Sequence, residues 1–131
     1  MISIYEDHKY LIVNTHLDNL FKCNRKRQLE VLTHIIEMEK TLGEDVIITG
    51  DFNMYLTGDL KTFKNQNKLV DAVSKKLGSS YRKFNFKEPI DHIFVSESTI
   101  QIEQTEYDRK KYSDVYPSDH YPVICKIKRK K

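Results

Sequence analysis

Residues 46–53 read VIITGDFN, a short apolar run that ends in a glycine and is followed by an acid and an amide. Four to eight apolar residues bounded by a chain breaker are typical of a buried strand. Gly50 permits a sharp backbone turn, so we expect the strand to leave its sheet there. Asp51 and Asn53 then lie at the carboxyl end of the strand, where open α/β sheets carry ligand sites. Both residue types are also ordinary turn formers, so this stretch alone does not distinguish a site from a turn.

A strand, a helix and a second strand are predicted around this stretch. Residues 10–16, YLIVNTH, form an apolar and partly β-branched run that favours a buried strand ending at His16. The helix between the two strands has Asn24 as its predicted N-cap and Gly43 as its C-cap. A strand–helix–strand order of this length predicts a parallel, right-handed βαβ unit. The apolar stripe expected to face the core contains Val31, Ile35, Met38 and Leu42, widened by Leu29, Leu32 and Ile36.

Further elements follow the same rules. We expect an edge strand at 1–5, a polar turn at 6–9 and one or two helical turns within 69–77. Strands are predicted at 89–96, from residue 100 onward and at 123–128. The polar loop 79–88 contains Tyr81, Phe84 and Phe86, which either pack the loop or stack on a base or sugar.

Length and charge set the class of protein. The chain has 131 residues, which is one domain or part of one, and a formal net charge of +3. That charge is too small to require a nucleic-acid partner by itself. Cys23 and Cys125 are far apart and match no metal or redox spacing, so free thiols in a reducing, cytoplasmic compartment are expected. No apolar run is long enough to span a membrane. The N-terminus lacks a signal-peptide pattern, but the sequence does not decide whether a leader segment has been removed.

Polar residues gather at the ends of the predicted strands. A carboxylate within the apolar strand 89–96 is costly unless it is paired, so Asp91 predicts a partner. Two histidines, three acids and an amide suit metal-assisted phosphoryl transfer, because carboxylate and amide oxygens favour Mg²⁺ over zinc. The residues are His16, Asp51, Asn53, Asp91, Asp119 and His120.

Five motifs together resemble the endonuclease/exonuclease/phosphatase, DNase I-like family. They occur in the family's order and cover residues 10–128. They are NTHL at 14–17, an Arg25-x-x-Gln28 helix start, GDFN at 50–53, IDHIFV at 90–95 and SDHYP at 118–122.

The resemblance implies a role for each matching residue. His16 would contact the scissile phosphate, Asp51 would orient or activate the attacking water, and Asn53 would hold the phosphate in the transition state. Asp91 would pair with the phosphate-contacting His120.

The resemblance also implies ligands for a metal and for the substrate. The metal would be Mg²⁺, with Mn²⁺ as an alternative, and its ligands would be Asp119, Asp51 and Asn53. The substrate would be a phosphate ester, including nucleic acid, bound by Arg25, Asn53 and His16.

The implied fold is the C-terminal part of a four-layer α/β sandwich, about one mixed sheet with covering helices. Residues 1–131 would be a partial domain that lacks the family's N-terminal strands and its metal-binding glutamate. Glu6 stands in the wrong place to be that ligand. One sheet face would then be uncovered, and we expect two copies to pair through it.

Three functions therefore stay open. The first is a metal-dependent phosphoesterase that needs the missing half for full activity. The second is an inactive domain that folds, dimerises and binds phosphate weakly. The third, a nucleic-acid-binding module, is the weakest because the basic residues are scattered. A basic patch at residues 25–27 is either a solvated face or a sign of an anion nearby.

Overall fold

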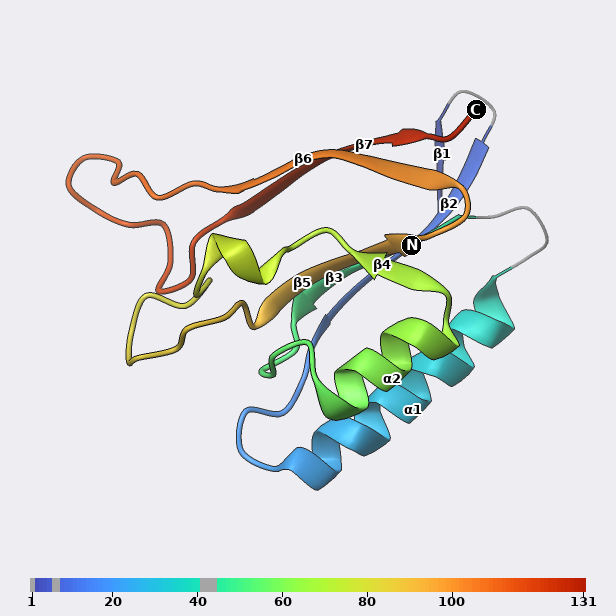
Figure 1. The fold of residues 1–131 in the computed structure, drawn as a ribbon, viewed down its shortest axis with the longest axis horizontal. Helices are drawn as coiled ribbons and strands as arrows, with labels where there is room; N and C mark the ends of the chain where they lie inside the picture. The colour runs from blue at the N-terminus through green and yellow to red at the C-terminus, as the bar shows by residue number, and fades with distance from the viewer. Residues whose placement is uncertain (1, 6–7, 41–44) are drawn as a thin grey trace.

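The computed structural model describes residues 2–5, 8–40 and 45–131. The chain contains both strands and helices, and each of the two α-helices lies between two strands in sequence (Figure 1). In order they are β1 (Ile2–Tyr5), β2 (His8–His16), α1 (Lys22–Glu39), β3 (Asp45–Asp51), α2 (Gly58–Gln66), β4 (Leu69–Asp71), a 3₁₀ turn (Lys75–Leu77), β5 (Asp91–Ser96), β6 (Ile100–Tyr107) and β7 (Val123–Arg129).

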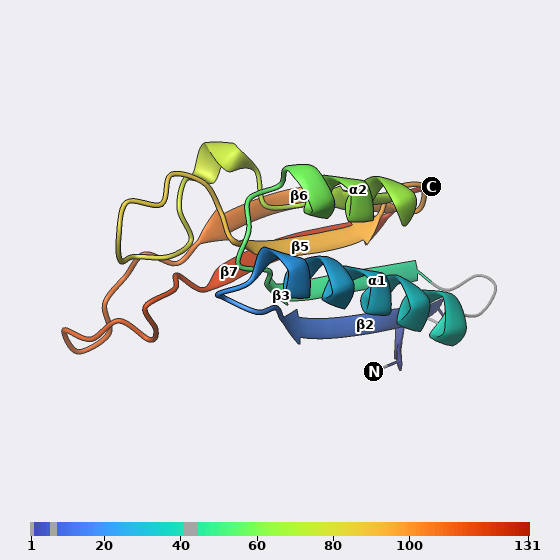
Figure 2. The same ribbon diagram turned by 90° about the horizontal axis from the view of Figure 1, so that it is seen from below.

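The main sheet is mixed and has the strand order β1-β2-β3-β5-β4. Strands β2 and β3 are parallel and joined through α1, as the sequence predicts, whereas the other neighbours are antiparallel. Both helices lie against one face of the sheet, and the β6–β7 hairpin lies on the other side (Figures 1 and 2). The chain thus forms one mixed sheet with covering helices and an additional two-stranded sheet.

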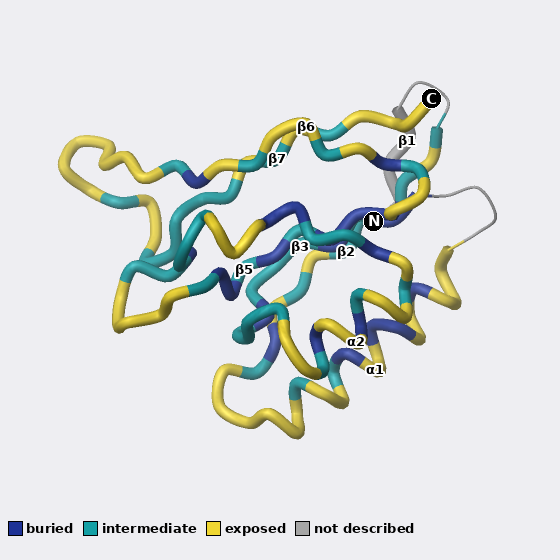
Figure 3. The backbone as a smooth tube through the Cα atoms, viewed as in Figure 1, coloured by how far each residue is buried: buried dark blue, intermediate teal, exposed yellow. Residues whose placement is uncertain are grey.

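The core lies between the helices and the sheet. Because side chains alternate along a strand, every second residue of β2, β3 and β5 faces the helices. Figure 3 shows these buried positions along the strands and at intervals on both helices. The cluster includes Leu11, Val46, Ile48 and Phe94 from the strands, Phe52, and Leu29, Leu32, Ile36, Leu60 and Phe63 from the helices.

The predicted core face of α1 is wrong. Val31 and Met38 are 57% and 64% exposed, and Ile35 is exposed as well. Two apolar stripes run along this helix, and spacing alone cannot choose between them. Packing against α2 and the sheet selects the stripe that was expected only to widen the face, namely Leu29, Leu32 and Ile36, together with Thr33. Leu42 and Gly43 lie outside the described residues.

The start of α1 also differs from prediction. Phe21 is the N-cap residue, and Asn24 lies inside the first turn. The Asn24 side chain donates a hydrogen bond of 2.9 Å to Asp18 Oδ2, and the N–H groups of Leu20 and Phe21 donate to Asp18 Oδ1. These donors, that of Asn24 first, hold the pKa of Asp18 below its ordinary value. The carboxylate of Asp18, just before the helix, therefore accepts the hydrogen bonds of three donors at the helix start.

Two further segments are strands where turns were expected. His8 and Lys9 belong to β2 and pair with β1, while residues 6 and 7 lie outside the described part. Residues 69–71 form β4, an edge strand paired with β5, and only 75–77 make the expected helical turn. Short apolar runs of this kind fit a strand or a helix equally well until a neighbouring strand pairs with them.

The β6–β7 hairpin is attached to the main sheet at both ends. At one end, Arg129 Nε lies 3.8 Å from the carboxylate of the buried Asp45, which also accepts a hydrogen bond from Thr99. At the other end, the Tyr107 hydroxyl donates to the carbonyl of Gly78 over 2.9 Å. Burial raises the pKa of Tyr107 to about 12, so this hydroxyl keeps its proton at neutral pH. The loop that joins β6 to β7 is thereby held near the end of the main sheet.

Gly50 has a different role from the one expected. Strand β3 runs through it to Asp51, so it marks no exit from the sheet. Its φ is +151°, and a Cβ built on it would lie 1.8 Å from the carbonyl oxygen of Thr15 in β2. Glycine is required because the two backbones approach closely where β2 and β3 end.

We predict that Gly50→Ala destabilises the fold severely, by roughly 3 kcal/mol or more, because backbone atoms cannot yield to the new methyl group. Urea unfolding followed by circular dichroism measures the change. Gly58→Ala is the matched control: its φ is also positive, at +49°, but nothing lies within 4 Å of the added Cβ. Equal losses in the two variants would show that backbone conformation, and not the approach of Thr15, sets the requirement.

Within the described residues, no helix combines the length and the apolar character needed to cross a bilayer.

Candidate active site

Strand register places three candidate residues in one row. His16 is paired with Asp51 across β2 and β3, and Asp51 is paired with Asp91 across β3 and β5. Paired residues on neighbouring strands project from the same face of a sheet. The carboxyl ends of β2 and β3 and the start of β5 therefore bring an imidazole and two carboxylates together. His16 Nε2 lies 3.4 Å from Asp51 Oδ2.

A loop from the distant end of the chain delivers His120 to this row. Its Nδ1 lies 2.6 Å from Asp91 Oδ2, and its Nε2 lies 3.5 Å from Asp51 Oδ2. Asp91 therefore has a partner, as the cost of a carboxylate in that strand requires. The imidazole is oriented by one carboxylate and presented to the other, an arrangement that fixes the position of the ring.

The backbone on both sides of His120 is clamped to the loop 79–82. The Arg82 N–H donates to the carbonyl of Asp119, and the Tyr121 N–H donates to that of Ser80, each over 2.8 Å. The buried Ser80 hydroxyl in turn accepts hydrogen bonds from the N–H groups of Ile90 and Asp91. One buried serine thus ties the segments that carry Asp91 and His120 to each other.

Asn53 closes the turn after β3. Its N–H donates to Asp51 Oδ1 over 2.8 Å, and its side-chain amide donates to the carbonyl of Leu17 over 2.7 Å. The residue has a φ of +50°, a conformation that asparagine tolerates better than most residues. The turn-forming and site-forming interpretations of this segment therefore describe the same geometry.

A second histidine–aspartate pair supports that turn from the core side. His92 is 2% exposed; its Nδ1 lies 2.6 Å from Asp71 Oδ2, and its Nε2 lies 2.9 Å from the carbonyl oxygen of Met54. Sequence reasoning missed this pair. The available signal was a histidine directly after Asp91, which strand alternation must turn toward the core, where it needs a polar partner.

The pKa of Asp51 is raised above its ordinary value. Burial is the largest cause and the nearby Asp91 adds to it, whereas the Asn53 N–H, His120 and His16 act in the opposite direction. A raised pKa makes a carboxylate a better proton acceptor than an ordinary aspartate. It also means that the folded state holds the Asp51 proton more tightly than the unfolded state does.

Charged Asp51 therefore costs folding free energy above its unfolded pKa, and this cost vanishes as the pH falls below that value. We predict that Asp51→Asn raises the melting temperature by a few degrees at pH 7 in EDTA and that the gain disappears below about pH 4. Calorimetry at several pH values measures it. A variant less stable than the parent at pH 7 would contradict this prediction.

The site opens into a cavity of about 680 Å³. The candidate residues that line it are His16, Asp51, Asn53, Asp91, Asp119 and His120. Arg25 is not among the lining residues; its guanidinium donates to the carbonyl of Asp18 at the start of α1. Its contact with substrate therefore stays a prediction, and in this structure the side chain is used at the helix entry. The lining also contains Tyr81, Phe84 and Phe86, which the sequence offered either as loop packing or as stacking groups, and three residues that sequence reasoning did not place there, namely Asn19, Ser118 and Ile90.

The described residues also offer donors for a cation. One ligand atom each from Asp51, Asp91 and His120 lies within 4.8 Å of the others, and Asp119 and Asn53 line the same cavity. Carboxylate and amide oxygens suit a hard divalent cation that keeps part of its shell as water and substrate oxygens. The donor set therefore fits a divalent metal.

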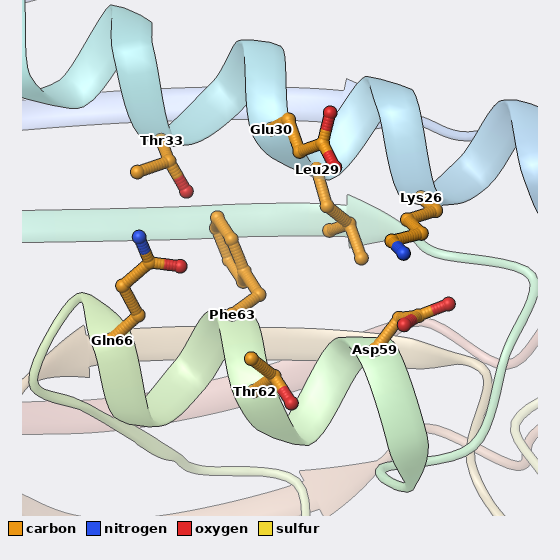
Figure 4. A pocket seen from close by; sticks show the side chains of 8 residues that line it. All are labelled: Lys26, Leu29, Glu30, Thr33, Asp59, Thr62, Phe63 and Gln66. Atoms are coloured by element: carbon orange, nitrogen blue, oxygen red, sulfur yellow. The ribbon is translucent and has the colours of Figure 1, made fainter.

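A second hollow lies between α1 and α2 (Figure 4). Its volume is about 120 Å³, and Lys26, Thr33, Asp59 and Gln66 are among the side chains around it. Its lining comes from the two helices alone and includes none of the candidate residues. It is the crevice where two helices pack.

Comparison with known proteins places this site in a family. The sequence model of the Endonuclease/Exonuclease/phosphatase family matches residues 5–120, so the chain belongs to that family. No curated protein matches the chain.

Solved structures share the fold of this chain. A mannosyl-6-phosphatase of Bacteroides thetaiotaomicron is 26% identical, with a TM-score of 0.78 over 93% of this chain and 52% of that one. A functionally unknown protein of Enterococcus faecalis is 22% identical, with a TM-score of 0.78 over 95% and 52% of the two chains. TDP2 of D. rerio, solved with a single-stranded DNA product, is 17% identical, with a TM-score of 0.74 over 97% and 58%.

Two conclusions follow from these likenesses. The predicted fold, a mixed α/β part of a DNase I-like sandwich, is confirmed. The chain spans about half the length of the solved structures that it matches.

Proposed function

We propose that this chain carries the phosphate-binding and water-activating side of a metal-dependent phosphoesterase. The observation that supports it best is the position of Asp51, which lies within 3.5 Å of His120 and His16 while Asp91 orients His120 from behind. Hydrolysis of a phosphate ester needs a proton acceptor for water and positive groups at the non-bridging oxygens. This cluster supplies both within one cavity.

Each residue has one step in the proposed reaction. Asp51 takes a proton from water as the water oxygen attacks phosphorus, and the bond from phosphorus to the leaving oxygen breaks; the leaving alkoxide takes a proton from solvent. His120, oriented by Asp91, and His16 donate hydrogen bonds to the phosphoryl oxygens. Asn53 has a second amide N–H for the same group, since the first is used by Leu17.

A divalent metal completes the proposal. Mg²⁺, with Mn²⁺ as an alternative, would be held by Asp51, Asn53 and Asp119 and would neutralise charge on the phosphate. The proposal covers phosphomonoesters and phosphodiesters alike, with Asn53 and His16 as the substrate contacts.

We further propose that full activity needs the half of the relatives' length that this chain does not cover. The solved structures have roughly twice its length, and the cavity is open in the described residues. A folded domain that binds phosphate without turnover is the alternative.

Phosphate binding and turnover separate these possibilities. We predict that the chain with Mg²⁺ binds inorganic phosphate, seen by ³¹P NMR, and that His120→Ala weakens binding at least 10-fold, because a charged hydrogen bond is lost. His34→Ala, an exposed histidine on α1, is the matched control.

Hydrolysis of bis(p-nitrophenyl) phosphate is measured with the same variants, with metal and with EDTA. Metal-dependent turnover that His120→Ala lowers by about 100-fold or more would show that the chain alone rebuilds the site. Phosphate binding without turnover supports the need for the other half. A folded chain with neither property contradicts the phosphoesterase proposal.

Pairing of two copies through the sheet face opposite the helices is also proposed. On that face Ile47 and Ile93 are only half-buried, since the β6–β7 hairpin covers part of the sheet. A face of this kind is stabilised by a second apolar layer.

We predict a dimer at tens of micromolar by light scattering, and a monomer after Ile47→Lys, which places a charge on this face. Val31→Lys, on the exposed stripe of α1, is the control that should stay dimeric. A parent chain that is monomeric at these concentrations contradicts the pairing.

A further inference from the structure

One wall of the active-site cavity is aromatic and has no part in the proposed reaction. Tyr81, Phe84 and Phe86 line the cavity together with the reacting groups. Phe84 is 81% exposed and Phe86 is 41% exposed. These two exposed phenylalanines differ from the scattered apolar residues of an ordinary surface, because both line the same cavity and both lie against Tyr81.

The rings form a path from the reacting groups to the rim. The Tyr81 ring centroid lies 4.8 Å from that of His120. From Tyr81 the path branches to Phe84 at 6.0 Å and to Phe86 at 5.5 Å, and Phe86 contacts Tyr55 at 6.4 Å. A molecule that reaches from the phosphate position toward solvent on this side would pass along these rings.

The loop is anchored at both sides of its tip. Tyr81 forms a backbone bridge with His120, and the Lys87 N–H donates to the Tyr55 hydroxyl over 3.1 Å. Between these anchors Phe84 takes a φ of +61°, which bulky residues rarely adopt. The loop therefore holds an exposed phenyl ring at the cavity on a residue whose backbone conformation is strained.

Packing of the loop does not account for Phe84. A side chain that stabilises a loop by packing is buried within it. Ser80 and Ile90, which lie nearby, are buried in this way. Phe84 has most of its surface in water, and strain at its backbone is not compensated by burial. A bound ligand that covers the ring would supply that compensation.

We propose that Phe84 and Phe86 form a stacking platform for the nucleobase of a phosphate ester whose phosphate occupies the site at His16, Asp51 and His120. The inference rests on the proposed phosphate site and assigns its substrate a chemical class. Base stacking on aromatic side chains is tolerant of base identity, because every base has a flat π-face.

A base fits this wall better than a sugar does. Phenyl rings have no hydrogen-bonding atoms, so they are covered best by a wide flat face whose polar atoms lie at its edge, and a base has a wider flat face than the C–H face of a sugar. A base can lay its face on the rings and keep its polar edge in solvent. Lys83 and Lys87, both exposed in the same loop, favour an anionic ligand on this side.

The test compares three ligands by NMR titration of the full chain with Mg²⁺: adenosine 5′-monophosphate, ribose 5-phosphate and adenosine. The nucleotide is expected to bind about 10-fold tighter than the sugar phosphate, the lower part of the range for one stacked base. Phe84→Ala is expected to remove that advantage and to leave ribose 5-phosphate binding unchanged. Phe86→Ala should act in the same direction.

Phe21→Ala is the matched control, since Phe21 is 58% exposed and does not line the cavity. Equal affinities for nucleotide and sugar phosphate, or an equal loss for both in Phe84→Ala, would overturn the platform. If neither phosphate ester binds, the phosphate site has failed, and adenosine decides the platform alone. Adenosine binding that Phe84→Ala abolishes supports it, and no adenosine binding overturns it.

Discussion

The close approach of β2 and β3 at their carboxyl ends is the constraint on which the site depends. Gly50 lets the backbone of β3 lie against the carbonyl of Thr15, and the parallel register there pairs His16 with Asp51. The antiparallel register with β5 then adds Asp91 to the same row. A shift of one residue in either pairing would turn one of these side chains to the opposite face of the sheet. The relative positions of His16, Asp51 and Asp91 are therefore set by strand register.

The carboxylates gathered at this end of the main sheet lower the stability of the fold. Asp51 and Asp91 carry like charges near each other, and burial raises the pKa of Asp51 further. The two histidines reduce this cost, and Asp91 is directly paired with His120. Such crowding is common where a group has to accept a proton or bind an anion, because the same features that weaken the fold give the site its reactivity.

Two of the histidine–aspartate pairs, both involving strand β5, show how position separates roles. His120 and Asp91 lie at the cavity, where the imidazole faces a second carboxylate. His92 lies one residue after Asp91 on β5, and Asp71 lies on the neighbouring strand β4. Both side chains are buried, and His92 Nε2 binds the carbonyl of Met54. One pair can meet a substrate, and the other holds the turn that carries Asn53.

Several features followed from the sequence alone. The βαβ unit, the strands at 91–96, 100–107 and 123–129, and the six polar residues at the cavity were predictable, because apolar runs and their polar ends are local patterns. Tertiary structure decided the rest. It chose which of two apolar stripes on α1 is buried, turned 69–71 into an edge strand, drew Arg25 away from the cavity and set the aromatic loop beside His120. These outcomes depend on contacts between segments far apart in the chain, and periodicity within one segment carries no information about its neighbours.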